Sequence, residues 1–259
     1  MIEIRSLEDV SFDVMTTAFN DAFSDYDIPA HYTTEYLKNL VTRRGYRPDL
    51  AVGAFDGGRL VGFVFNCLDG DEAYNSGTGV VMSHRRRGIG RQIMQRSIDT
   101  LPANRYMLEV IETNVRAESL YRQLGFVETR RLQSWTYVAQ TLLSVPAQVG
   151  VAVLHESWFD MRPSWQNSLA SLRRASEPCD ILGDDRGYVV VFPSNGDIPL
   201  LAVRRDQRRK GIGRSLLETA ANRVGKPLRI MNVEDRFEPF LKRIGAKKLV
   251  RQIEMVRSL

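Results

Sequence analysis

Two segments of the chain combine arginines with glycines at the same spacing. They are Arg85-x-x-Gly88-x-Gly90 and Arg208-x-x-Gly211-x-Gly213. Glycine has no Cβ, so its backbone can turn sharply and lie close to a ligand. The free N–H groups at the start of a helix, together with the positive end of the helix dipole, bind phosphate oxygens. Each segment is therefore predicted to cradle a pyrophosphate group.

Basic side chains surround both pairs of glycines. They are Arg85, Arg86, Arg87 and Arg91 in the first copy, and Arg208, Arg209, Lys210 and Arg214 in the second. The spacing is not that of the Walker motif or of the dinucleotide fingerprint. A basic turn closed by glycine would explain a single copy equally well, but two copies in one context favour the phosphate site.

The elements that must position these segments recur in the two halves of the chain. In each half a strand pattern leads to the arginines and a helical pattern starts at the glycines. Four pairs of elements correspond, the first of each pair in the first half of the chain. The helices that start at the glycines are expected at 88–101 and 211–224, and the strands that follow at 105–111 and 228–233. The next helices are expected at 115–124 and 237–245, and the final strands at 126–139 and 247–256. The repeat predicts two copies of one fold.

The first half is longer than the second. Before the repeat it carries strand patterns at 3–7, 50–56, 59–68 and 73–82, and helical patterns at 9–23 and 33–44. The second half carries a helical pattern at 162–175 and strand patterns at 187–193 and 198–205. Pro146 and Gly150 interrupt the pattern between them. The sequence predicts two α/β domains, at 1–141 and 150–259, the second with a reduced N-terminal part.

Composition excludes several classes of protein. Hydrophobic residues make up 43% and charged residues 26%, as in a soluble protein with a core. No apolar run is long enough for a membrane helix, and the N-terminus lacks a signal-peptide pattern, so no membrane association is expected. The net charge of +5 fits an anionic partner, either a nucleotide cofactor or a nucleic acid, and fits a slightly basic solvated surface as well.

Cysteine and histidine are scarce. Cys67 and Cys179 do not make a disulfide framework, and three scattered histidines show no metal-ligand spacing. We therefore expect no metal and a reducing, cytoplasmic location.

The first segment and its surroundings resemble the acyl-CoA-binding region of the GCN5-related N-acetyltransferases (GNAT), whose pattern is Arg/Gln-x-x-Gly-x-Gly/Ala. "GTGVVMSHRRRGIGRQIM" and "LEVIETNVRAESLYRQLGF" follow that family's order of central strand, CoA loop, strand and helix. The resemblance covers most of residues 2–138 and, with fewer motifs, about 185–259. It implies two tandem GNAT-like domains, each a mixed, largely antiparallel sheet with splayed central strands flanked by helices. It also implies acetyl-CoA as cosubstrate, held where two parallel strands separate.

The resemblance also assigns cofactor-binding residues. The backbone at Val80, Val81 and Met82 would pair with the pantetheine arm and supply an N–H donor to the oxyanion. The phosphate cradle would be Arg85, Arg86, Arg87, Gly88, Ile89, Gly90 and Arg91 in the first half, and Arg208, Gly211 and Gly213 in the second.

Acetyl transfer to an amine needs a base, donors for the developing oxyanion, and a proton for the leaving thiolate unless the thiolate is tolerated. The spacing Glu109-x4-Asn114-x6-Tyr121 resembles that of the family's N-terminal-amine acetyltransferases, including those acting on ribosomal proteins. This implies Glu109 as base, directly or through water, Tyr121 as acid, and Asn114 as a ligand of pantetheine or of a water. The residue types alone also allow an exposed strand carboxylate in an ion pair, a packed aromatic and a helix N-cap.

The acceptor is left open by the sequence. In the family, the N-terminal helical region shapes the acceptor pocket, and acidic side chains there would attract an ammonium group. Its polar residues are Asp25, Tyr26, Asp27, Tyr32 and Glu35, which also fit a solvated loop. A peptide N-terminus, a lysine, a polyamine, an aminoglycoside or another small amine would each suit.

The second half departs from the catalytic pattern. Alignment on the glycines puts Asn232 at the position of Glu109, and alignment on the helix ends puts Leu241 at that of Tyr121. Glu234 is the nearest counterpart of Asn114. We therefore expect a catalytic first domain and a degenerate second domain that either still binds acyl-CoA or completes the acceptor cleft.

Two other function classes remain as alternatives. A non-catalytic acyl-CoA-binding or regulatory protein would not need the complete Glu109, Asn114 and Tyr121 set. Nucleic-acid binding is disfavoured because the arginines gather at two helix starts rather than along one face with interleaved aromatics.

Overall fold

The computed structural model describes residues 1–26, 31–140 and 154–259, and it divides into two compact units. Unit 1 comprises Met1–Thr129, Arg173–Ser176 and Glu254–Leu259; unit 2 comprises Arg130–Leu172 and Glu177–Ile253. The expected linker at 142–150 lies outside the described residues. Unit 1 is therefore assembled from three separate stretches of chain, one of which is the C-terminal end.

Unit 1 contains a sheet in the order β1-β2-β3-β4-β5-β11. Its strands are β1 (Ile2–Ser6), β2 (Val52–Asp56), β3 (Arg59–Asp69), β4 (Glu72–Val80), β5 (Arg105–Ile111) and the end of β11 (Lys247–Ser258). Strands β1 to β4 pair antiparallel, and β4 pairs parallel with β5. The mixed, largely antiparallel sheet is the fold class that the sequence predicted.

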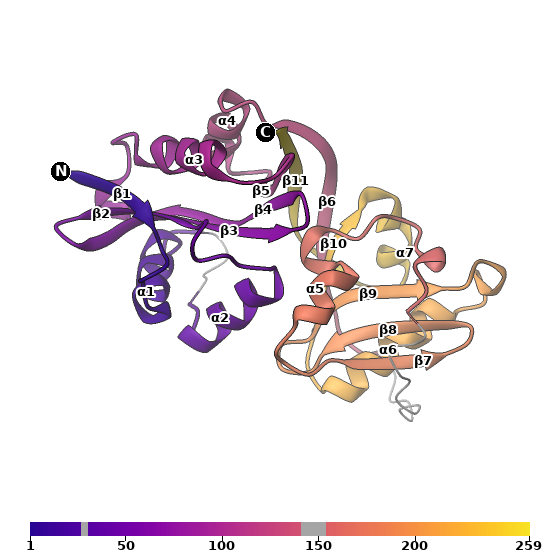
Figure 1. The fold of residues 1–259 in the computed structure, drawn as a ribbon. Helices are drawn as coiled ribbons and strands as arrows, with labels where there is room; N and C mark the ends of the chain where they lie inside the picture. Colours follow the sequence, from indigo (N-terminus) through magenta and orange to yellow (C-terminus); the bar gives the residue numbers. More distant parts are fainter. Residues whose placement is uncertain (27–30, 141–153) are drawn as a thin grey trace. The chain divides into compact units, whose positions relative to one another are not determined.

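Helices cover both faces of this sheet. Figure 1 shows α1 (Phe12–Ala22) and α2 (Thr34–Arg43) on one face, and α3 (Ile89–Thr100) and α4 (Val115–Gln123) on the other. Strand β3 is consequently buried without interruption from Leu60 to Cys67. The helices begin at polar caps: the Ser11 side chain accepts from the N–H of Val14, and the Thr33 side chain from that of Tyr36.

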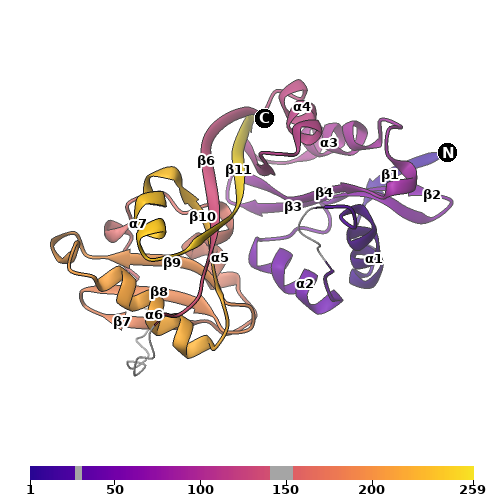
Figure 2. The same cartoon turned by 180° about the vertical axis from the view of Figure 1, so that it is seen from behind.

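Unit 2 repeats the later part of this plan, with the order β11-β6-β10-β9-β8-β7. Its strands are β6 (Val127–Tyr137), β7 (Asp180–Asp184), β8 (Gly187–Phe192), β9 (Asp197–Val203) and β10 (Leu228–Glu234). Its helices are α5 (Leu169–Arg174), α6 (Ile212–Val224) and α7 (Glu238–Arg243). The same elements, seen from behind in Figure 2, include the strand β10 between β9 and β6.

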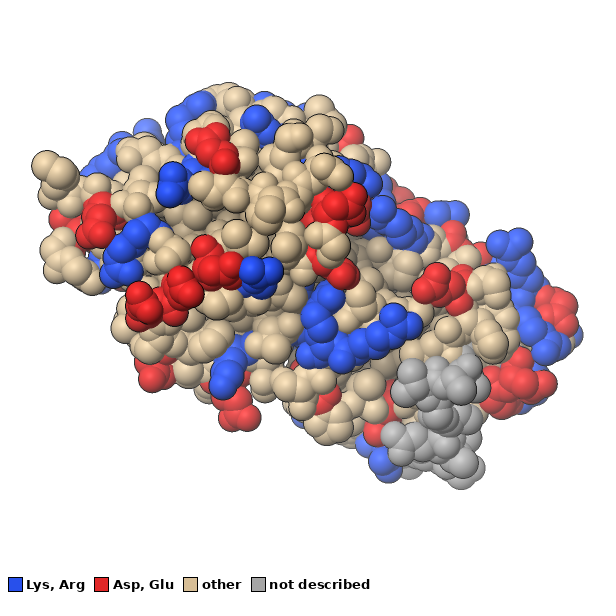
Figure 3. Space-filling view, in the orientation of Figure 1, with Lys and Arg blue, Asp and Glu red and all other residues tan. Residues whose placement is uncertain are grey.

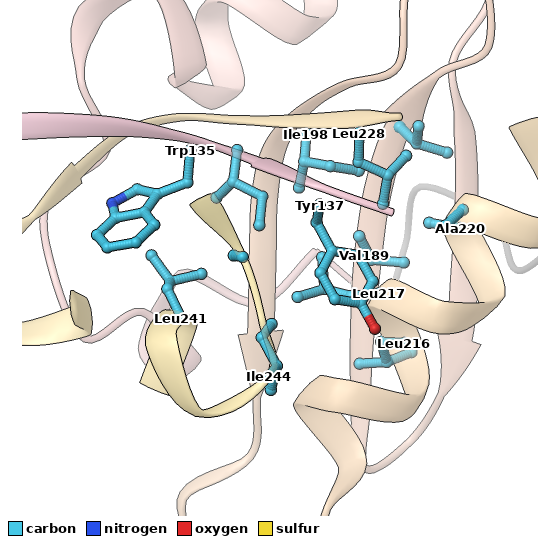
Figure 4. Packing of buried hydrophobic residues seen from close by; sticks show 14 of the residues in the cluster. Trp135, Tyr137, Val189, Ile198, Leu216, Leu217, Ala220, Leu228, Leu241 and Ile244 are labelled. Carbon is cyan, nitrogen blue, oxygen red and sulfur yellow. The ribbon is translucent and has the colours of Figure 1, made fainter. Parts of the chain in front are cut away.

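The core of unit 2 forms between α6, α7 and the sheet. Figure 4 shows Trp135 and Tyr137 of β6 among Leu217 of α6 and Leu241 of α7. All four side chains are at most 2% exposed. This buried cluster, which also includes residues of β8, β9 and β10, makes unit 2 a folded body in its own right.

Two sequence expectations for the start of unit 2 are wrong. The helix expected at 162–175 is only α5, because the Ser168 hydroxyl accepts from the N–H of Ser171 at 3.1 Å and so caps the helix there. Strand β7 was not expected, since its two aspartates and Gly183 resemble a loop. Its pairing with β8 makes it a strand at the edge of the sheet. Among the helices that the structure describes, none is long and apolar enough to cross a membrane.

Candidate active site

The two central strands of unit 1 separate part-way along their length. Strand β4 pairs with β5 only from Glu72–Arg105 to Asn75–Leu108, although β4 continues to Val80. The register between β3 and β4 shifts at the same place: Asn66 opposes Asn75, whereas Val64 opposes Thr78. One extra residue is therefore inserted in β4 near Ser76, and a bulge of this kind bends the strand that carries it. The bulge explains why β4 parts from β5 there.

Unit 2 separates its central strands in the same way. Strand β9 pairs with β10 only at Asp197–Arg229 and Ile198–Ile230. The register against β8 shifts between Asp197 and Leu200, which inserts an extra residue in β9 beside Pro199. Proline lacks an N–H and is accommodated in a sheet at such a bulge. The splayed strands implied by the family resemblance are thus present in both units.

The two arginine–glycine loops have the same backbone conformation. Arg86 and Gly88 both adopt positive φ, at 68° and 76°, and their counterparts Arg209 and Gly211 do so at 62° and 81°. Left-handed residues in a turn aim successive N–H groups into one concavity that suits an anion. Helices α3 and α6 begin directly after these glycines, so each loop adds the positive end of a helix dipole.

The hydrogen bonds within the two loops also correspond one to one. The equivalent pairs are His84 N–H to Val81 O and Gln207 N–H to Arg204 O, both at 2.9 Å, and Gln92 N–H to Gly88 O at 3.2 Å and Ser215 N–H to Gly211 O at 3.0 Å. The second copy therefore keeps the geometry of the first as well as its sequence pattern.

The first arginine of each loop braces the protein. Arg85 donates to the carbonyl oxygens of Val80 at 3.3 Å and Ala22 at 2.8 Å, and it pairs with Asp25 at 2.6 Å. In unit 2, Arg208 donates likewise to Val203 and Trp158 and pairs with Asp160 at 2.6 Å. Both side chains fasten the loop to the strand end and to an N-terminal segment of their own unit.

The remaining predicted loop residues divide into buried and exposed ones. Ile89 is 2% exposed and anchors the first turn of α3 in the core. The guanidinium of Arg87 donates to the Ser83 carbonyl at 3.2 Å, and that of Arg91 to Gln123 of α4. Arg86 is exposed at the left-handed position of the loop.

The backbone of β4 offers donors where β5 has left. The N–H of Val81 donates to Val61 O at 3.0 Å, and that of Met82 to Asp21 Oδ1 at 3.0 Å. Hydrogen-bonding residues alternate along an antiparallel strand, so Val80 and Thr78 turn their N–H groups away from β3, toward the side that β5 vacates. Of the three residues predicted to line the pantetheine, Val80 has its backbone facing that side.

Glu109 lies one residue beyond the last paired residue of β5. Its Oε2 accepts from the Tyr74 hydroxyl at 3.1 Å. Burial and the charge of Glu109 raise the pKa of Tyr74 well above its ordinary value, so Tyr74 stays a neutral donor. Glu109 also lies near the cation of Arg44.

Asn114 and Tyr121 join the same region from α4. Asn114 is the N-cap of α4, with its Oδ1 accepting from Ala117 N–H at 3.1 Å, and its Nδ2 donates to the Tyr26 hydroxyl at 2.7 Å. Tyr121 is 7% exposed, and its side chain lies close to that of Thr78. Burial raises the pKa of Tyr121 to about 12, so Tyr121 carries its proton at neutral pH. The strand separation thus brings Thr78, Tyr121 and the backbone of Val80 together.

Sequence reasoning missed Thr78, Tyr74 and Arg44. Thr78 and Tyr74 are of residue types that are common in any strand, and Arg44, which precedes a glycine, has the sequence pattern of a solvated helix end. One signal in the sequence could have found two of them. Tyr74, Ser76 and Thr78 stand at every second position of β4, so a regular strand would place their polar side chains on one face.

The N-terminal acidic region is only partly described. Asp25 is held by Arg85, which lowers the pKa of Asp25 below its ordinary value. The backbone of Tyr32 exchanges two hydrogen bonds of 2.9 Å with the Asn20 side chain, and its ring stacks on Phe19. Glu35 lies in the first turn of α2. Asp27 lies outside the described residues.

The corresponding positions of unit 2 are apolar or turned away. Leu241 is the structural counterpart of Tyr121. The N–H of Ala246 donates to the Leu241 carbonyl at 3.0 Å, just as the N–H of Phe126 donates to the Tyr121 carbonyl at 3.0 Å. Leu241 lies in the buried cluster, against which Leu201 packs at the position of Thr78. Asn232 lies in a bulge of β10 with φ 55°, and its side chain bonds to Ser134 of β6.

Charge on the surface is mixed in sign. Over the face drawn in Figure 3, basic and acidic side chains are interspersed. Among the described residues near the second loop, Arg186 pairs with Asp184 and Arg204 with Asp206. The face drawn in Figure 3 is thus unlike the single basic stripe of a nucleic-acid surface.

The comparisons with known proteins agree with this geometry. Residues 12–126 match the model of the acetyltransferase (GNAT) family. A tandem GNAT protein of the clavulanic acid biosynthesis pathway matches with a TM-score of 0.75 at 16% identity, covering 100% of this chain and 98% of that one. A protein of Pyrococcus horikoshii described as an acetyltransferase matches with a TM-score of 0.74 at 18% identity, over 100% of this chain and 89% of that one.

A third solved structure, a GCN5-related N-acetyltransferase of Sphaerobacter thermophilus, matches with a TM-score of 0.71 at 16% identity, over 99% of this chain and 95% of that one. No curated protein matches the sequence. At these identities the structural matches establish the fold, which extends over both units. With a GNAT acetyltransferase domain at residues 12–126 and the tandem GNAT fold over its length, the chain is an acyltransferase.

Proposed function

We propose that unit 1 transfers an acetyl group from acetyl-CoA to a primary amine, with Glu109 as base and Tyr121 as acid. The observation that carries this proposal is the separation of β4 from β5 just after Asn75 and Leu108. Beyond that point Glu109 lies on one strand, while Tyr121 reaches Thr78 on the other. Acid, base and backbone donors therefore meet where the paired part of the sheet ends.

The chain's own residues suit acetyl-CoA. The left-handed turn at Arg86 and Gly88, followed by α3, presents N–H groups and dipole charge to a pyrophosphate. The N–H groups of Thr78 and Val80 would pair with the amide groups of a pantetheine arm as a further strand would. Acetyl-CoA, when bound, supplies the activated thioester. Asn114 would hold the arm or a water near Tyr26.

The proposed chemistry needs four proton and charge movements. Glu109 takes a proton from the acceptor ammonium, directly or through a water, which frees the nitrogen lone pair for attack on the thioester carbonyl. An N–H of β4, at Thr78 or Val80, stabilises the negative charge that develops on the carbonyl oxygen. The carbon–sulfur bond breaks as the Tyr121 hydroxyl gives its proton to the sulfur, and the Tyr121 phenolate then takes the second proton of the attacking nitrogen, which leaves a neutral amide and free CoA. The raised pKa of Tyr121, about 12, keeps that proton available at neutral pH.

For unit 2 we propose phosphate binding without catalysis by these groups. Its loop repeats the backbone and hydrogen bonds of the first. The hydroxyl pair of Thr78 and Tyr121 is replaced by Leu201 and Leu241, so the acid is absent, and Asn232 faces Ser134. These features support a degenerate second domain that retains an acyl-CoA site. The domain limits of 1–141 and 150–259 stay predictions.

The acceptor class proposed is a primary amine, such as a peptide N-terminus, a lysine or a small polyamine. The carboxylates of Asp25 and Glu109 would attract an ammonium group. The cytoplasmic location stays a prediction. A purely regulatory acyl-CoA-binding protein remains the second candidate, and it is favoured only by the intact loop of unit 2.

Isothermal titration of the purified protein with acetyl-CoA tests the donor site. The matched variants are Gly88→Glu/Gly90→Glu and Gly211→Glu/Gly213→Glu, which place carboxylates at the same positions of each loop. We expect two sites per chain, each lost with its own pair of substitutions. A single site abolished by the first pair alone would restrict binding to unit 1. No binding would overturn the proposed function.

A further inference from the structure

Arg44 links the strand bulge to the proposed base. It is the C-cap of α2, and the backbone that follows is fixed to β3 by two hydrogen bonds, Leu68 N–H to Gly45 O at 3.0 Å and Arg47 N–H to Asn66 O at 2.9 Å. The Nη1 of Arg44 donates to the carbonyl oxygen of Ser76 at 3.1 Å and to its hydroxyl at 3.0 Å. One fixed guanidinium therefore holds the residue at which β4 bends.

A β-bulge interrupts the ladder and leaves backbone groups that need other partners. The Ser76 carbonyl lies at such a point, because β5 pairing ends at Asn75 and β3 pairing is shifted there. A charged donor forms a stronger hydrogen bond with a carbonyl than a neutral donor does. Arg44 therefore stabilises the bend that separates the two strands.

The same guanidinium lies among groups that bear or could bear negative charge. Burial would lower the pKa of Arg44, but its neighbours raise that pKa above its ordinary value. These neighbours come from four elements: Tyr74 of β4, Glu109 of β5, Tyr32 before α2, and Cys67 of β3. Burial raises the pKa of Cys67 to about 12 and that of Tyr74 well above its ordinary value, so both are neutral near pH 7. Glu109 is the carboxylate among these neighbours of Arg44.

We propose that Arg44 is a positioning residue for acetyl transfer, which fixes the bulge at Ser76 and holds Glu109 in its ionised, proton-accepting form. This inference rests on the proposed role of Glu109. Tyr74 acts beside Arg44 by donating to Glu109 Oε2 at 3.1 Å. A cation near a carboxylate favours its charged form, so removing the charge of Arg44 should make Glu109 easier to protonate.

Unit 2 has neither the serine at the bulge nor the carboxylate of this arrangement. At the place of Ser76 it has Pro199, and at that of Glu109 the bulged Asn232 bonds to Ser134. A unit without the carboxylate has no need of a cation to keep that carboxylate ionised. A carboxylate at the position of Glu109, near a buried arginine, is therefore found in the unit that we propose to be catalytic and is replaced by Asn232 in the other.

The test measures kcat/KM against pH for Arg44→Gln and Arg44→Lys, with Arg47→Gln as control. Arg47 lies three residues on and pairs at the surface with Asp49. We expect Arg44→Gln to lower kcat about 10- to 100-fold. The acid limb, meaning the fall of kcat/KM at low pH, should move up by about one pH unit or more, because a nearby opposite charge shifts the pKa of a carboxylate by that amount. Arg44→Lys keeps a charge, so its acid limb should stay near the wild-type position.

Stability and donor binding are measured on the same samples. Acetyl-CoA affinity should change less than about twofold in Arg44→Lys, because Arg44 bonds to Ser76, nine positions before Arg85 of the phosphate loop. If Arg44→Gln does not fold, Ser76→Ala and Arg44→Lys still test the proposal. Ser76→Ala removes only the hydroxyl contact, so it should leave the acid limb unchanged, while a shifted limb in Arg44→Lys would contradict the charge argument.

Glu109→Gln separates this proposal from the proposed function. If Glu109→Gln abolishes the acid limb and Arg44→Gln leaves it in place, Arg44 is only structural and the function stands. If Glu109→Gln retains the wild-type rate, the proposed base is wrong, and the role of Arg44 fails with it.

Discussion

The two glycines of the first loop should respond oppositely to alanine. Gly88 has φ +76°, and a Cβ there would meet only Gln92 Nε2 at 3.7 Å, so alanine would be strained but not crowded. The left-handed conformation costs an L-residue about 1–2 kcal/mol, or roughly 5- to 30-fold in an equilibrium. We expect this cost in Gly88→Ala to appear in acetyl-CoA affinity, in stability, or divided between them.

Gly90 differs because it lies in the first turn of α3 without a positive φ. A Cβ there would meet Leu120 at 3.6 Å and Val80 at 3.9 Å, which are ordinary contacts. Alanine also favours a helix over glycine by up to about 1 kcal/mol. We therefore expect Gly90→Ala to keep the acetyl-CoA affinity within about twofold and the melting temperature at or above that of the wild type.

Titration calorimetry with acetyl-CoA and thermal unfolding of both variants test this reasoning. Gly211→Ala provides the same strain in unit 2, where φ is +81° and a Cβ would meet nothing within 4 Å. If Gly90→Ala weakens binding as strongly as Gly88→Ala, then close approach of the ligand, and not backbone strain, is what requires glycine. That result would refute the account of the loop given above.

Two further predictions concern single side chains. Tyr121→Phe should lower kcat about 100-fold or more while leaving acetyl-CoA affinity within about threefold, because only the proton donor is lost. Steady-state kinetics and titration calorimetry measure the two quantities. An unchanged kcat would exclude Tyr121 as the acid. Asp25→Asn should destabilise the protein slightly, by up to about 1 kcal/mol, above pH 4. The pKa of Asp25 is lowered by Arg85, so the pair stabilises the fold above the unfolded value of 3.8 and loses this effect as pH falls through the lowered folded value. Urea unfolding of both proteins from pH 7 downward measures the difference, which should shrink at acid pH; a difference independent of pH would mean that the charge of Asp25 is not involved.

Much of the repeated fold could be predicted because it depends on local signals. Gly88 and Gly211 start helices where the sequence expected them, and Asn114 caps α4 as its type and position indicated. These features need only backbone sterics and nearby hydrogen bonds. The candidate acid and base were identified through their spacing in the resemblance, and their roles stay predictions.

The parts that could not be predicted depend on long-range contacts. Arg44 and Ser76 are 32 positions apart, and nothing in either sequence neighbourhood indicates that they bond. The end of β11 belongs to unit 1 although its start belongs to unit 2, which no periodicity can show. The bulge in β4 depends on the register against β3, and register is a property of two strands together.

The most direct test of the central claim is the rate of CoA release by the full chain with acetyl-CoA and a panel of primary amines, followed through the free thiol. Wild type would be compared with the Glu109→Gln/Tyr121→Phe double variant and with Glu118→Gln, a carboxylate on α4 that pairs with Arg122 at the surface. We predict that the double variant loses at least about 1,000-fold in kcat, still binds acetyl-CoA, and that Glu118→Gln matches the wild type. A double variant that transfers acetyl groups at the full rate would contradict the assignment of acid and base to unit 1.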